Sequence, residues 1–550
     1  MQRRRLLLQL TQAAAALAWQ QVFAPSARAQ APQWADWSSP YAVFTLGVAS
    51  GEPRPNSVVL WTRLAPRPMQ PDGGMPARAI PVKWTVASDA RFTQVVQSGV
   101  VLAQPDVAHS VHVEVTGLQP ARTYFYRFEA GGQPSPPGRT ATAPDPADSP
   151  KRLRVALASC QHLEAGYYAV HREIAAADVD LVLFVGDYIY ETQMPSHLRV
   201  RKHPHVFDSD PEDYTLADYR LHHASYKRDA DLQACHAAHP WLMVWDDHEV
   251  LNDYAGVTAP KVPDRLAFLR LRTMAYRAYF EHLPVSPSRM PVGPVMRMQD
   301  RYEWGQLAEF WLVDGRQHRD RHVCSGLHAP KRGTLLWRCD AANAPERTLM
   351  GVDQENWLAD GLASSTRAWK FIVQPTQISP SALKTPLGPL VYADGWDAYP
   401  AARERLMAAI AQPRVPDVIC LGGDVHRHVA ANLRFNPMDP ASPVVATEFV
   451  TSSVTSKGLG EVVNNWMKSS NPDLLHMRSD ERGYTLLDIS PQQVLCEFRG
   501  TPHPVRADAR LHTQARFVVE RGVPGPRKLD GLLQSPHGQT PVQTAGSQGA

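Results

Sequence analysis

The chain has 550 residues, of which 44% are apolar and 20% charged, and its formal net charge is +3. These values exclude a mainly disordered chain and indicate an ordinary globular protein, large enough for more than one domain and a substantial core. Six cysteines are too few for a disulfide-based scaffold, so apolar packing must hold the fold.

Residues 1–29 have the features of an export signal. A basic head containing Arg3, Arg4 and Arg5 precedes a modest apolar stretch, and Ala27-Arg28-Ala29 provides a small-x-small cleavage site. The stretch is too short and too polar for a membrane span. The arginines predict the twin-arginine export machinery as a partner and a periplasmic or secreted protein, although an ordinary signal with one extra arginine remains open.

Removal of this signal would change the formal charge from +3 to −1, because it contains four arginines and no acidic residue. A nearly neutral mature protein lacks the basic surface of a nucleic-acid binder. We therefore expect no specific binding to nucleic acid.

Residues 40–145 are predicted to be all-β. Apolar or alternating runs at 57–64, 82–87, 110–116 and 122–130 are separated by Pro and Gly turns. The sequence Thr-Gly-Leu-Gln-Pro from Thr116, followed by Thr-Tyr-Phe-Tyr-Arg from Thr123, resembles a fibronectin type III-like sandwich. A linker rich in Pro, Ala and Asp follows.

Residues 150–515 have the alternation of strands and helices that is typical of an α/β layered domain. Helical periodicity is found at 166–177, 264–282 and 401–411. The segment 521–550 is dense in Pro, Gly, Gln and Ser and is predicted to be disordered.

Three apolar strands of this second region end in ionisable residues. The run 181–190 ends in Gly-Asp187 with Tyr190 three residues later, and the run 417–428 ends in Gly-Gly-Asp424-Val-His426. Ligand sites of α/β proteins lie at such strand ends. One Gly-Asp alone would favour a turn in which Asp caps the next segment, but two such endings predict a metal site.

A third strand, within 241–254, ends in Asp246-Asp247-His248-Glu249. Burying so many charges is costly unless they coordinate cations, although a solvated turn remains possible. Cys160 also follows an apolar strand, 153–159, and is either a ligand or a buried thiol. Cys324 and Cys339 flank a short polar stretch that would permit a disulfide in an oxidising compartment.

Together these motifs resemble the PhoD family of alkaline phosphatases and phosphodiesterases, within the calcineurin-like, purple-acid-phosphatase-like metallophosphoesterase superfamily. The resemblance covers most of the chain after the signal. The matching motifs are Gly47-Val-Ala-Ser-Gly-Glu-Pro, Ser57-Val-Val-Leu-Trp-Thr-Arg, Ala158-Ser-Cys, Gly186-Asp-Tyr-Ile-Tyr-Glu, Asp246-Asp-His-Glu, Asp314-Gly-Arg-Gln-His-Arg, Gly423-Asp-Val-His and Glu448-Phe-Val-Thr-Ser-Ser-Val-Thr-Ser. The implied fold is an all-β sandwich before an α/β (α+β layered) metallophosphoesterase domain of stacked mixed sheets.

The resemblance also implies the metals and their ligands. Iron(III) would be bound by Cys160, Asp187, Tyr190 and His426. Calcium would be bound by Asp187, Asp247 and Asp424, with Asp187 bridging the two ions. Thiolate, phenolate and imidazole suit iron, and carboxylates suit calcium.

The implied reaction is hydrolysis of phosphate monoesters, diesters or both by metal-activated hydroxide. His248 would donate a proton or hydrogen bond to the substrate, or would only orient Asp247. Arg316 would bind phosphate oxygens, or would form a structural ion pair. Gly315 and His318 replace the Thr and Tyr of the family motif, which puts this wall of the pocket in doubt.

The hydroxyl-rich stretch 447–456 is expected to line the pocket, with a polar loop as the alternative. Two other functions remain open. One is a phospholipase D-type phosphodiesterase that uses the same site. The other is a secreted surface-binding protein with structural calcium only, which Cys160 and Tyr190 argue against because calcium does not favour thiolate or phenolate.

Overall fold

The computed structural model describes residues 37–205, 210–324, 335–337 and 339–529. The chain divides into two units, Met1–Ser39 and Pro40–Ala550, and the description below concerns the second. The predicted signal, residues 1–29, lies outside the described residues. Among the described helices, none is long and apolar enough to cross a membrane.

The largest sheet has ten strands and contains the parallel neighbours β9, β10 and β11 at its centre. Their residues are all buried, as expected for parallel strands covered on both faces. In spatial order the strands are β25 (Arg527–Lys528), β24 (His512–Glu520), β23 (Gln493–Pro502), β22 (Glu481–Ile489), β9 (Leu153–Ala158), β10 (Leu181–Val185), β11 (Pro240–Val244), β1 (Val48–Gly51), β2 (Ser57–Arg63) and β5 (Ser110–Thr116).

A second, seven-stranded sheet faces the first across the main apolar core. The side chains of β18 point alternately to the two faces of this sheet. Ile419 and Leu421 belong to the core shared with β9–β11, whereas Cys420 belongs to a second core on the opposite face. The strands in order are β12 (Asp300–Trp304), β13 (Ala308–Leu312), β15 (Trp369–Val373), β18 (Val418–Gly422), β20 (Val444–Val450), β19 (His428–Arg434) and β21 (Leu474–Arg478).

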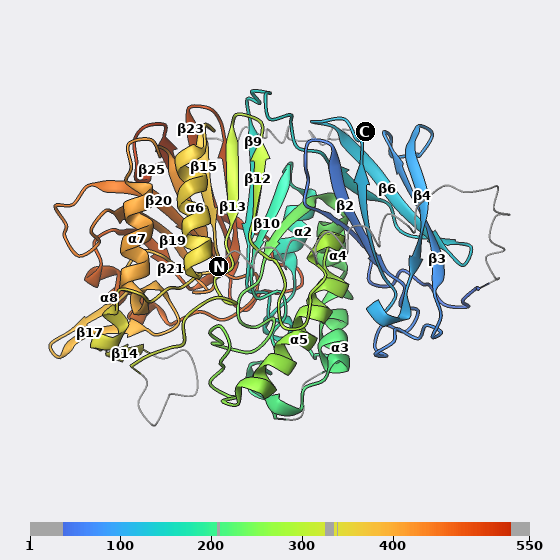
Figure 1. Ribbon diagram of the computed structural model, residues 1–550, viewed down its shortest axis with the longest axis horizontal. Coiled ribbons are helices and arrows are strands. Elements are labelled where there is room, and N and C mark those ends of the chain that lie inside the picture. The colour runs from blue at the N-terminus through green and yellow to red at the C-terminus, as the bar shows by residue number, and fades with distance from the viewer. Residues whose placement is uncertain (1–36, 206–209, 325–334, 338, 530–550) are drawn as a thin grey trace, which may run out of the picture. The chain divides into compact units, whose positions relative to one another are not determined.

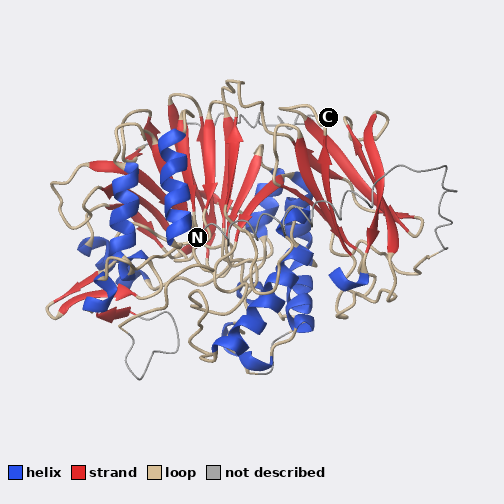
Figure 2. Ribbon diagram, viewed as in Figure 1, coloured by secondary structure: helices blue, strands red, loops and turns tan. Residues whose placement is uncertain are grey.

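Helices cover the outer faces of the two sheets. Helices α6 and α7 lie side by side across the seven-stranded sheet (Figures 1 and 2), and their leucines belong to its second core. Helices α2, α4 and α5 contribute to the main core. The helices are α2 (Ala169–Ala176), α3 (Leu216–Lys227), α4 (Ala230–Ala238), α5 (Arg265–His282), α6 (Val352–Ser364), α7 (Pro400–Ile410) and α8 (Glu461–Ser470). The helices predicted at 166–177, 264–282 and 401–411 are confirmed as α2, α5 and α7.

The N-terminal region consists mainly of strands, as predicted (Figure 2, right). One of its two sheets is not separate from the second region, however. Strands β1, β2 and β5 extend the ten-stranded sheet, because β1 pairs in parallel with β11. Gly51 permits this pairing, since a Cβ there would lie 2.2 Å from the backbone oxygen of Pro284. The other strands form a smaller sheet: β3 (Ile80–Ala87), β4 (Val95–Ala103), β6 (Thr123–Ala130), β7 (Gln133–Pro134) and β8 (Gly138–Ala141).

Three smaller features complete the fold. Strands β14 (Leu335–Trp337), β16 (Leu383–Thr385) and β17 (Gly388–Tyr392) form a three-stranded sheet. Single-turn 3₁₀ helices are η1 (Pro105–Val107), η2 (Leu163–Ala165), η3 (Ser196–Leu198), η4 (Pro211–Asp213), η5 (Pro287–Arg289), η6 (Asp340–Asn343) and η7 (Trp396–Ala398). Cys324 and Cys339 form the disulfide that their spacing permits.

The predicted disordered tail begins too early. Residues 521–529 are ordered, because β25 pairs with the edge strand β24 and the backbone N–H of Leu529 donates to the carbonyl of Arg516. An edge strand has unpaired backbone groups. Hydrogen bonds to these groups outweigh the weak strand propensity of this Pro- and Gly-rich segment. Residues 530–550 lie outside the described residues.

Buried neutral histidines should make the fold sensitive to acid, and His171 of α2 is a clear case. Its side chain is fully buried, its Nε2–H donates to Oε1 of Gln161 at 2.6 Å, and burial lowers its pKa to about 4. This histidine therefore binds a proton near pH 6.5 in the unfolded chain but only near pH 4 in the folded chain. The free energy of unfolding falls as the pH drops from 6.5 towards 4.

We expect His171→Gln to remove the pH-dependent part of the unfolding free energy that comes from this histidine. Between pH 7 and pH 4, the difference in unfolding free energy between the wild type and the variant should shrink by up to about 3 kcal/mol. Urea unfolding at several pH values measures it. A difference that stays constant over this range would contradict the assignment.

Candidate metal centre at the strand ends

Four predicted ligand positions follow the carboxyl ends of strands that lie close together. Cys160, Asp187 and Asp247 follow the parallel neighbours β9, β10 and β11, so they meet at one edge of the ten-stranded sheet. Asp424 follows β18 of the facing sheet. A cavity of about 310 Å³ lies there. Its lining includes Asp187, Asp247, His248, Asp253, Asp424 and His426.

The backbone at these positions is strained. Cys160, Asp187, Asp424 and His426 have φ values of 60°, 58°, 62° and 53°, in the left-handed region that residues other than glycine rarely adopt. Such strain costs roughly 1–3 kcal/mol per residue and is concentrated at functional sites.

Glycine allows the strand ends to approach one another. Gly186 has φ of 94°, and a Cβ there would lie 2.4 Å from Cβ of Asp246. At Gly423 a Cβ would lie 2.6 Å from Oγ of Ser159. Close packing therefore requires glycine before each aspartate, and at Gly186 the positive φ requires it as well.

Tyr190, Asp187 and His426 converge on one point. The Tyr190 hydroxyl donates to Oδ2 of Asp187 at 2.7 Å and lies 3.0 Å from Nε2 of His426. Nδ1 of His426 must carry the proton, because it donates to the carbonyl of Lys457 at 2.8 Å. Burial lowers the pKa of His426 to about 3, so Nε2 presents a lone pair. One phenol proton cannot satisfy both an ionised Asp187 and the lone pair of His426, whereas a cation between the three groups would keep Asp187 ionised and satisfy them all.

Buried acidic groups beside this point also lack compensation. Oδ1 of Asp187 is buried without a hydrogen-bond partner, and burial raises the pKa of this carboxyl well above its usual range. Burial, with Asp247 and Asp394 nearby, raises the pKa of Asp424 to about 6. Within the described residues, Cys160, Asp187 and His426 form one group with metal-ligand spacing, and Asp187, Asp247 and His248 form another. The donor set therefore fits bound cations.

The carboxylates of Asp424 and Asp247 are oriented by neighbours. Oγ1 of Thr376 donates to Oδ2 of Asp424 at 2.6 Å, and the backbone N–H of Asp253 donates to Oδ2 of Asp247 at 2.6 Å. Asp253 lines the cavity and joins Asp247 and Asp394 in a third group with metal-ligand spacing. Sequence reasoning assigned no role to Asp253, Asp394 or Thr376, because Asp394 and Thr376 lie in loops without a recognisable motif.

His248 is held by a buried carboxylate. Its Nδ1 donates to Oε2 of Glu191 at 2.6 Å, and the backbone N–H of Asn252 donates to the other oxygen of Glu191 at 3.0 Å. Burial alone would lower the pKa of His248, but Glu191, Asp247 and Asp187 outweigh burial and raise this pKa well above its usual value. His248 therefore faces the cavity as a proton-bearing imidazole.

Arg316 does not reach the cavity. It is fully buried and pairs with three carboxylates: Asp246, Asp247 at 3.3 Å and Asp394 at 2.6 Å. A guanidinium enclosed in this way has no free fork for phosphate. The position of Arg316 matches the alternative role, a structural ion pair. Its guanidinium holds the carboxylate of Asp247 on the side away from the cavity.

Loss of this arginine should destabilise the protein. Arg316→Gln would leave buried carboxylates without a counter-charge, and we expect the unfolding free energy to fall by about 3–5 kcal/mol. Arg506→Gln is a suitable control, because its pair with Asp508 is exposed and should add little to stability. Urea unfolding of both variants measures the effect. Equal stabilities of the two would contradict this role.

The hydroxyl-rich stretch 447–456 does not line the cavity, contrary to expectation. Ser456 Oγ donates to the carbonyl of Cys160 at 2.9 Å, and Thr455 Oγ1 donates to that of His162 at 2.8 Å. These hydroxyls fasten the loop after β20 to the strained chain after β9. His428 accepts a hydrogen bond from the N–H of Ser452 and stacks on Phe498, outside the cavity lining.

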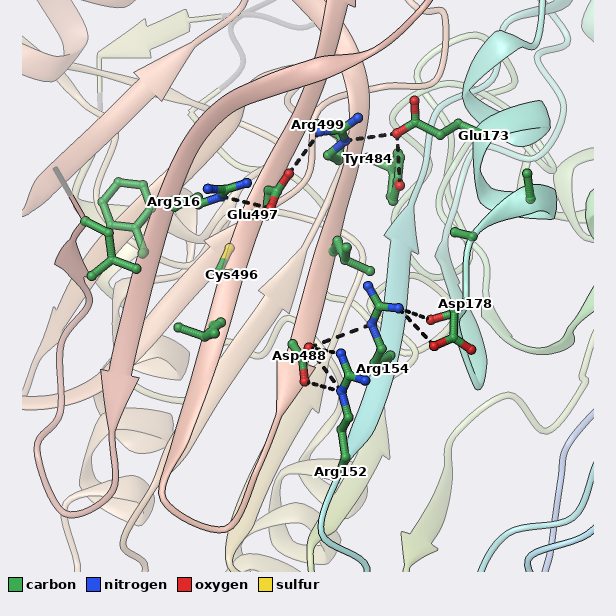
Figure 3. Close-up of a pocket in the computed structure, with 16 residues that line it drawn as sticks. Arg152, Arg154, Glu173, Asp178, Tyr484, Asp488, Cys496, Glu497, Arg499 and Arg516 are labelled. Carbon is green, nitrogen blue, oxygen red and sulfur yellow. Dashed lines mark hydrogen bonds and ion pairs between the residues drawn. The ribbon is translucent and has the colours of Figure 1, made fainter. Parts of the chain in front are cut away.

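A larger cavity, about 710 Å³, lies elsewhere, between α2 and strands β22–β24 (Figure 3). Four arginines line it, and each is paired with a carboxylate. The pairs are Arg152–Asp488, Arg154–Asp178, Arg499–Glu173 and Arg516–Glu497. Its charges are mutually compensated, and none of the three groups with metal-ligand spacing lies there. The smaller cavity is therefore the candidate active site.

Comparison with known proteins agrees with the site and the fold. The models of the PhoD-like phosphatase and of the PhoD-like phosphatase N-terminal domain match residues 155–498 and 29–144. Alkaline phosphatase D of Bacillus subtilis (strain 168) is 40% identical over 493 residues, covering 88% of this chain and 82% of that protein. A solved structure of PhoD superposes with a TM-score of 0.84 at 39% identity, covering 90% of this chain and 94% of that one. The chain therefore belongs to the PhoD-like phosphatase family of phosphoester hydrolases.

Proposed function

We propose that this chain is an exported, metal-dependent hydrolase of phosphate monoesters, diesters or both. The observation that carries the metal dependence is the conflict around Tyr190, whose single proton faces both Asp187 and the lone pair of His426. The buried, unpartnered Oδ1 of Asp187 supports the same conclusion.

In this proposal Cys160, Asp187, Tyr190 and His426 hold iron(III), and Asp187, Asp247 and Asp424 hold calcium. Thiolate, phenolate and imidazole match the preferences of iron, and oxygen ligands match those of calcium. When bound, these ions would stabilise negative charge on the phosphoryl oxygens and make an attacking water more acidic.

Side chains of the protein would then protonate the leaving oxygen and position the ligands. His248 lines the cavity, and its Nδ1 is engaged by Glu191, so its Nε2 is the atom available to give a proton to the leaving group. Arg316 is a positioning residue that holds Asp247. No side-chain nucleophile is required, because water attacks phosphorus and the ester P–O bond breaks.

Hydrolysis of p-nitrophenyl phosphate and bis(p-nitrophenyl) phosphate across alkaline pH tests the proposal. The protein should be isolated in folded form and supplied with calcium. Turnover that chelation removes and metals restore would support it, and the ratio of the two rates would rank monoesters against diesters. Absence of turnover with confirmed metal content would favour a surface-binding protein with structural calcium. Choline release from phosphatidylcholine would favour the phospholipase D-type alternative.

The proposal includes export by the twin-arginine route, with residues 40–145 as the β-sandwich domain and residues 150–515 as the catalytic domain. Replacing Arg3, Arg4 and Arg5 with lysines keeps the charge and removes the arginine signal. Export of a reporter that must fold before transport should stop. Continued export of that reporter would contradict the route.

A further inference from the structure

One wall of the candidate active-site cavity carries positive charge that the reaction described above does not use. This wall comes from the chain after β18, the end of β17 and the loop before α8. Its residues include Arg427, Lys457, Tyr392, Leu459 and Met467. We call Arg427 and Lys457 the cationic wall.

Lys457 is fastened beside the metal ligands by its backbone, while its side chain is exposed. Its carbonyl accepts the hydrogen bond from Nδ1 of His426 at 2.8 Å. The next residue, Gly458, packs so closely that a Cβ would lie 2.5 Å from the carbonyl oxygen of His426. No described carboxylate forms an ion pair with the ammonium group of Lys457. A fixed backbone with an unpaired ammonium group on a cavity wall is suited to an anionic ligand.

Arg427 adds an unusual buried charge. Only 3% of the residue is exposed, its NH2 group donates to Oε1 of Gln377 at 2.8 Å, and its Nε has no partner. Among the described residues, no carboxylate lies within ion-pair distance of Arg427, in contrast to Arg316 with three. Burial outweighs the attraction of the more distant Asp424, Asp397 and Glu448, and an anion entering the cavity would give this guanidinium the direct partner that it lacks.

The carboxylates of the same cavity limit where an anion can bind. Asp187, Asp247, Asp253 and Asp424 surround the reacting position, so a second anion must approach from the cationic wall. Phosphate matches this wall well, because arginine and lysine both bind its oxygens through charge-assisted hydrogen bonds. The apolar side chains of Leu459 and Met467 would contact a short carbon linker between the two phosphates.

We propose that the cationic wall is a subsite for a second phosphate, and that the preferred substrates are phosphate esters whose leaving group carries that phosphate. This inference rests on the proposed hydrolase function. Water forms a bond to the reacting phosphorus, the ester P–O bond breaks, and the leaving oxygen takes a proton. The products are inorganic phosphate and an alcohol that retains the second phosphate.

The test compares propane-1,3-diol bisphosphate with propane-1,3-diol monophosphate, using initial release of inorganic phosphate by the metal-loaded protein. The wild type should have the higher kcat/KM for the bisphosphate, after correction for its two equivalent esters. Lys457→Gln should lower the bisphosphate-to-monophosphate ratio about fivefold, and Lys457→Arg should largely restore it. The ratio should also decrease with added salt, since the lysine is exposed.

Lys468→Gln is the matched control, because Lys468 lies on α8 outside the cavity lining and should leave the ratio unchanged. An unchanged ratio in Lys457→Gln would overturn the inference while leaving the hydrolase function intact. Failure of the wild type to release phosphate from either compound would overturn the inference and exclude monoester hydrolysis. The hydrolase function itself would fail only if bis(p-nitrophenyl) phosphate were also not hydrolysed. Arg427→Gln should lower the same ratio, and a normal ratio there would remove Arg427 from the subsite.

Discussion

Replacing Asp187 with asparagine should reduce kcat/KM for phosphate esters by at least about 10³-fold and should deplete iron and calcium together. The physical reason is its place between the two proposed ligand sets. Oδ2 already faces Tyr190 and the His426 side, and the buried Oδ1 has no partner. Asparagine keeps the volume of the side chain but removes the charge and one acceptor.

The measurement is kcat/KM together with elemental analysis of the same preparation. Asp360→Asn is the control, because Asp360 is exposed on α6 and should leave both values unchanged. Circular dichroism should show that both variants are folded. Near-normal hydrolysis by Asp187→Asn would eliminate the bridging assignment, and loss of only one metal would assign Asp187 to that metal alone.

Replacing His248 with asparagine should slow hydrolysis in a way that depends on the leaving group. If His248 gives a proton to the leaving oxygen, kcat for an alkyl phosphate should fall about 10²-fold or more. The fall for p-nitrophenyl phosphate should be much smaller, because nitrophenolate departs without protonation. Glu191→Gln should give the same pattern at reduced size, since Glu191 holds Nδ1 of His248 at 2.6 Å.

Kinetics with the two substrates distinguish the two roles considered for His248. An equal loss for both leaving groups would mean that the histidine only positions Asp247. His197→Asn is the control, because His197 is exposed in η3 and lies outside the cavity lining. Metal content should be measured in each variant, so that loss of metal is separated from loss of proton transfer.

The strand ends could be predicted because the pattern that produces them is local. An apolar run followed by Gly-Asp encodes a buried strand and a turn within ten residues, and both are found at β10 with Asp187 and at β18 with Asp424. The tight contacts at Gly186 and Gly423 explain why glycine precedes each aspartate. The helices α5 and α7 were predictable for the same reason, since their periodicity is contained in one segment.

The role of Arg316 could not be read from its motif. The same arginine would suit phosphate or carboxylates, and the choice depends on Asp246 and Asp394, which are 70 and 78 residues away along the chain. The hydroxyls of Thr455 and Ser456 were misjudged for a similar reason, because their acceptors lie nearly 300 residues earlier. Where a side chain has several possible partners, the packing of the folded chain decides which one it contacts, and its neighbours in sequence do not.

The sequence by itself determined the strands that end at the site, the helices α2, α5 and α7, the family resemblance and the residue types able to bind metals. Only the tertiary structure decided that β1, β2 and β5 continue the catalytic sheet, that Glu191 holds His248, and that Arg427 is buried with no partner for its Nε. The physical reason is range. Propensity and periodicity act over a few residues, whereas sheet pairing, burial and charge compensation depend on groups that meet only when the chain is folded.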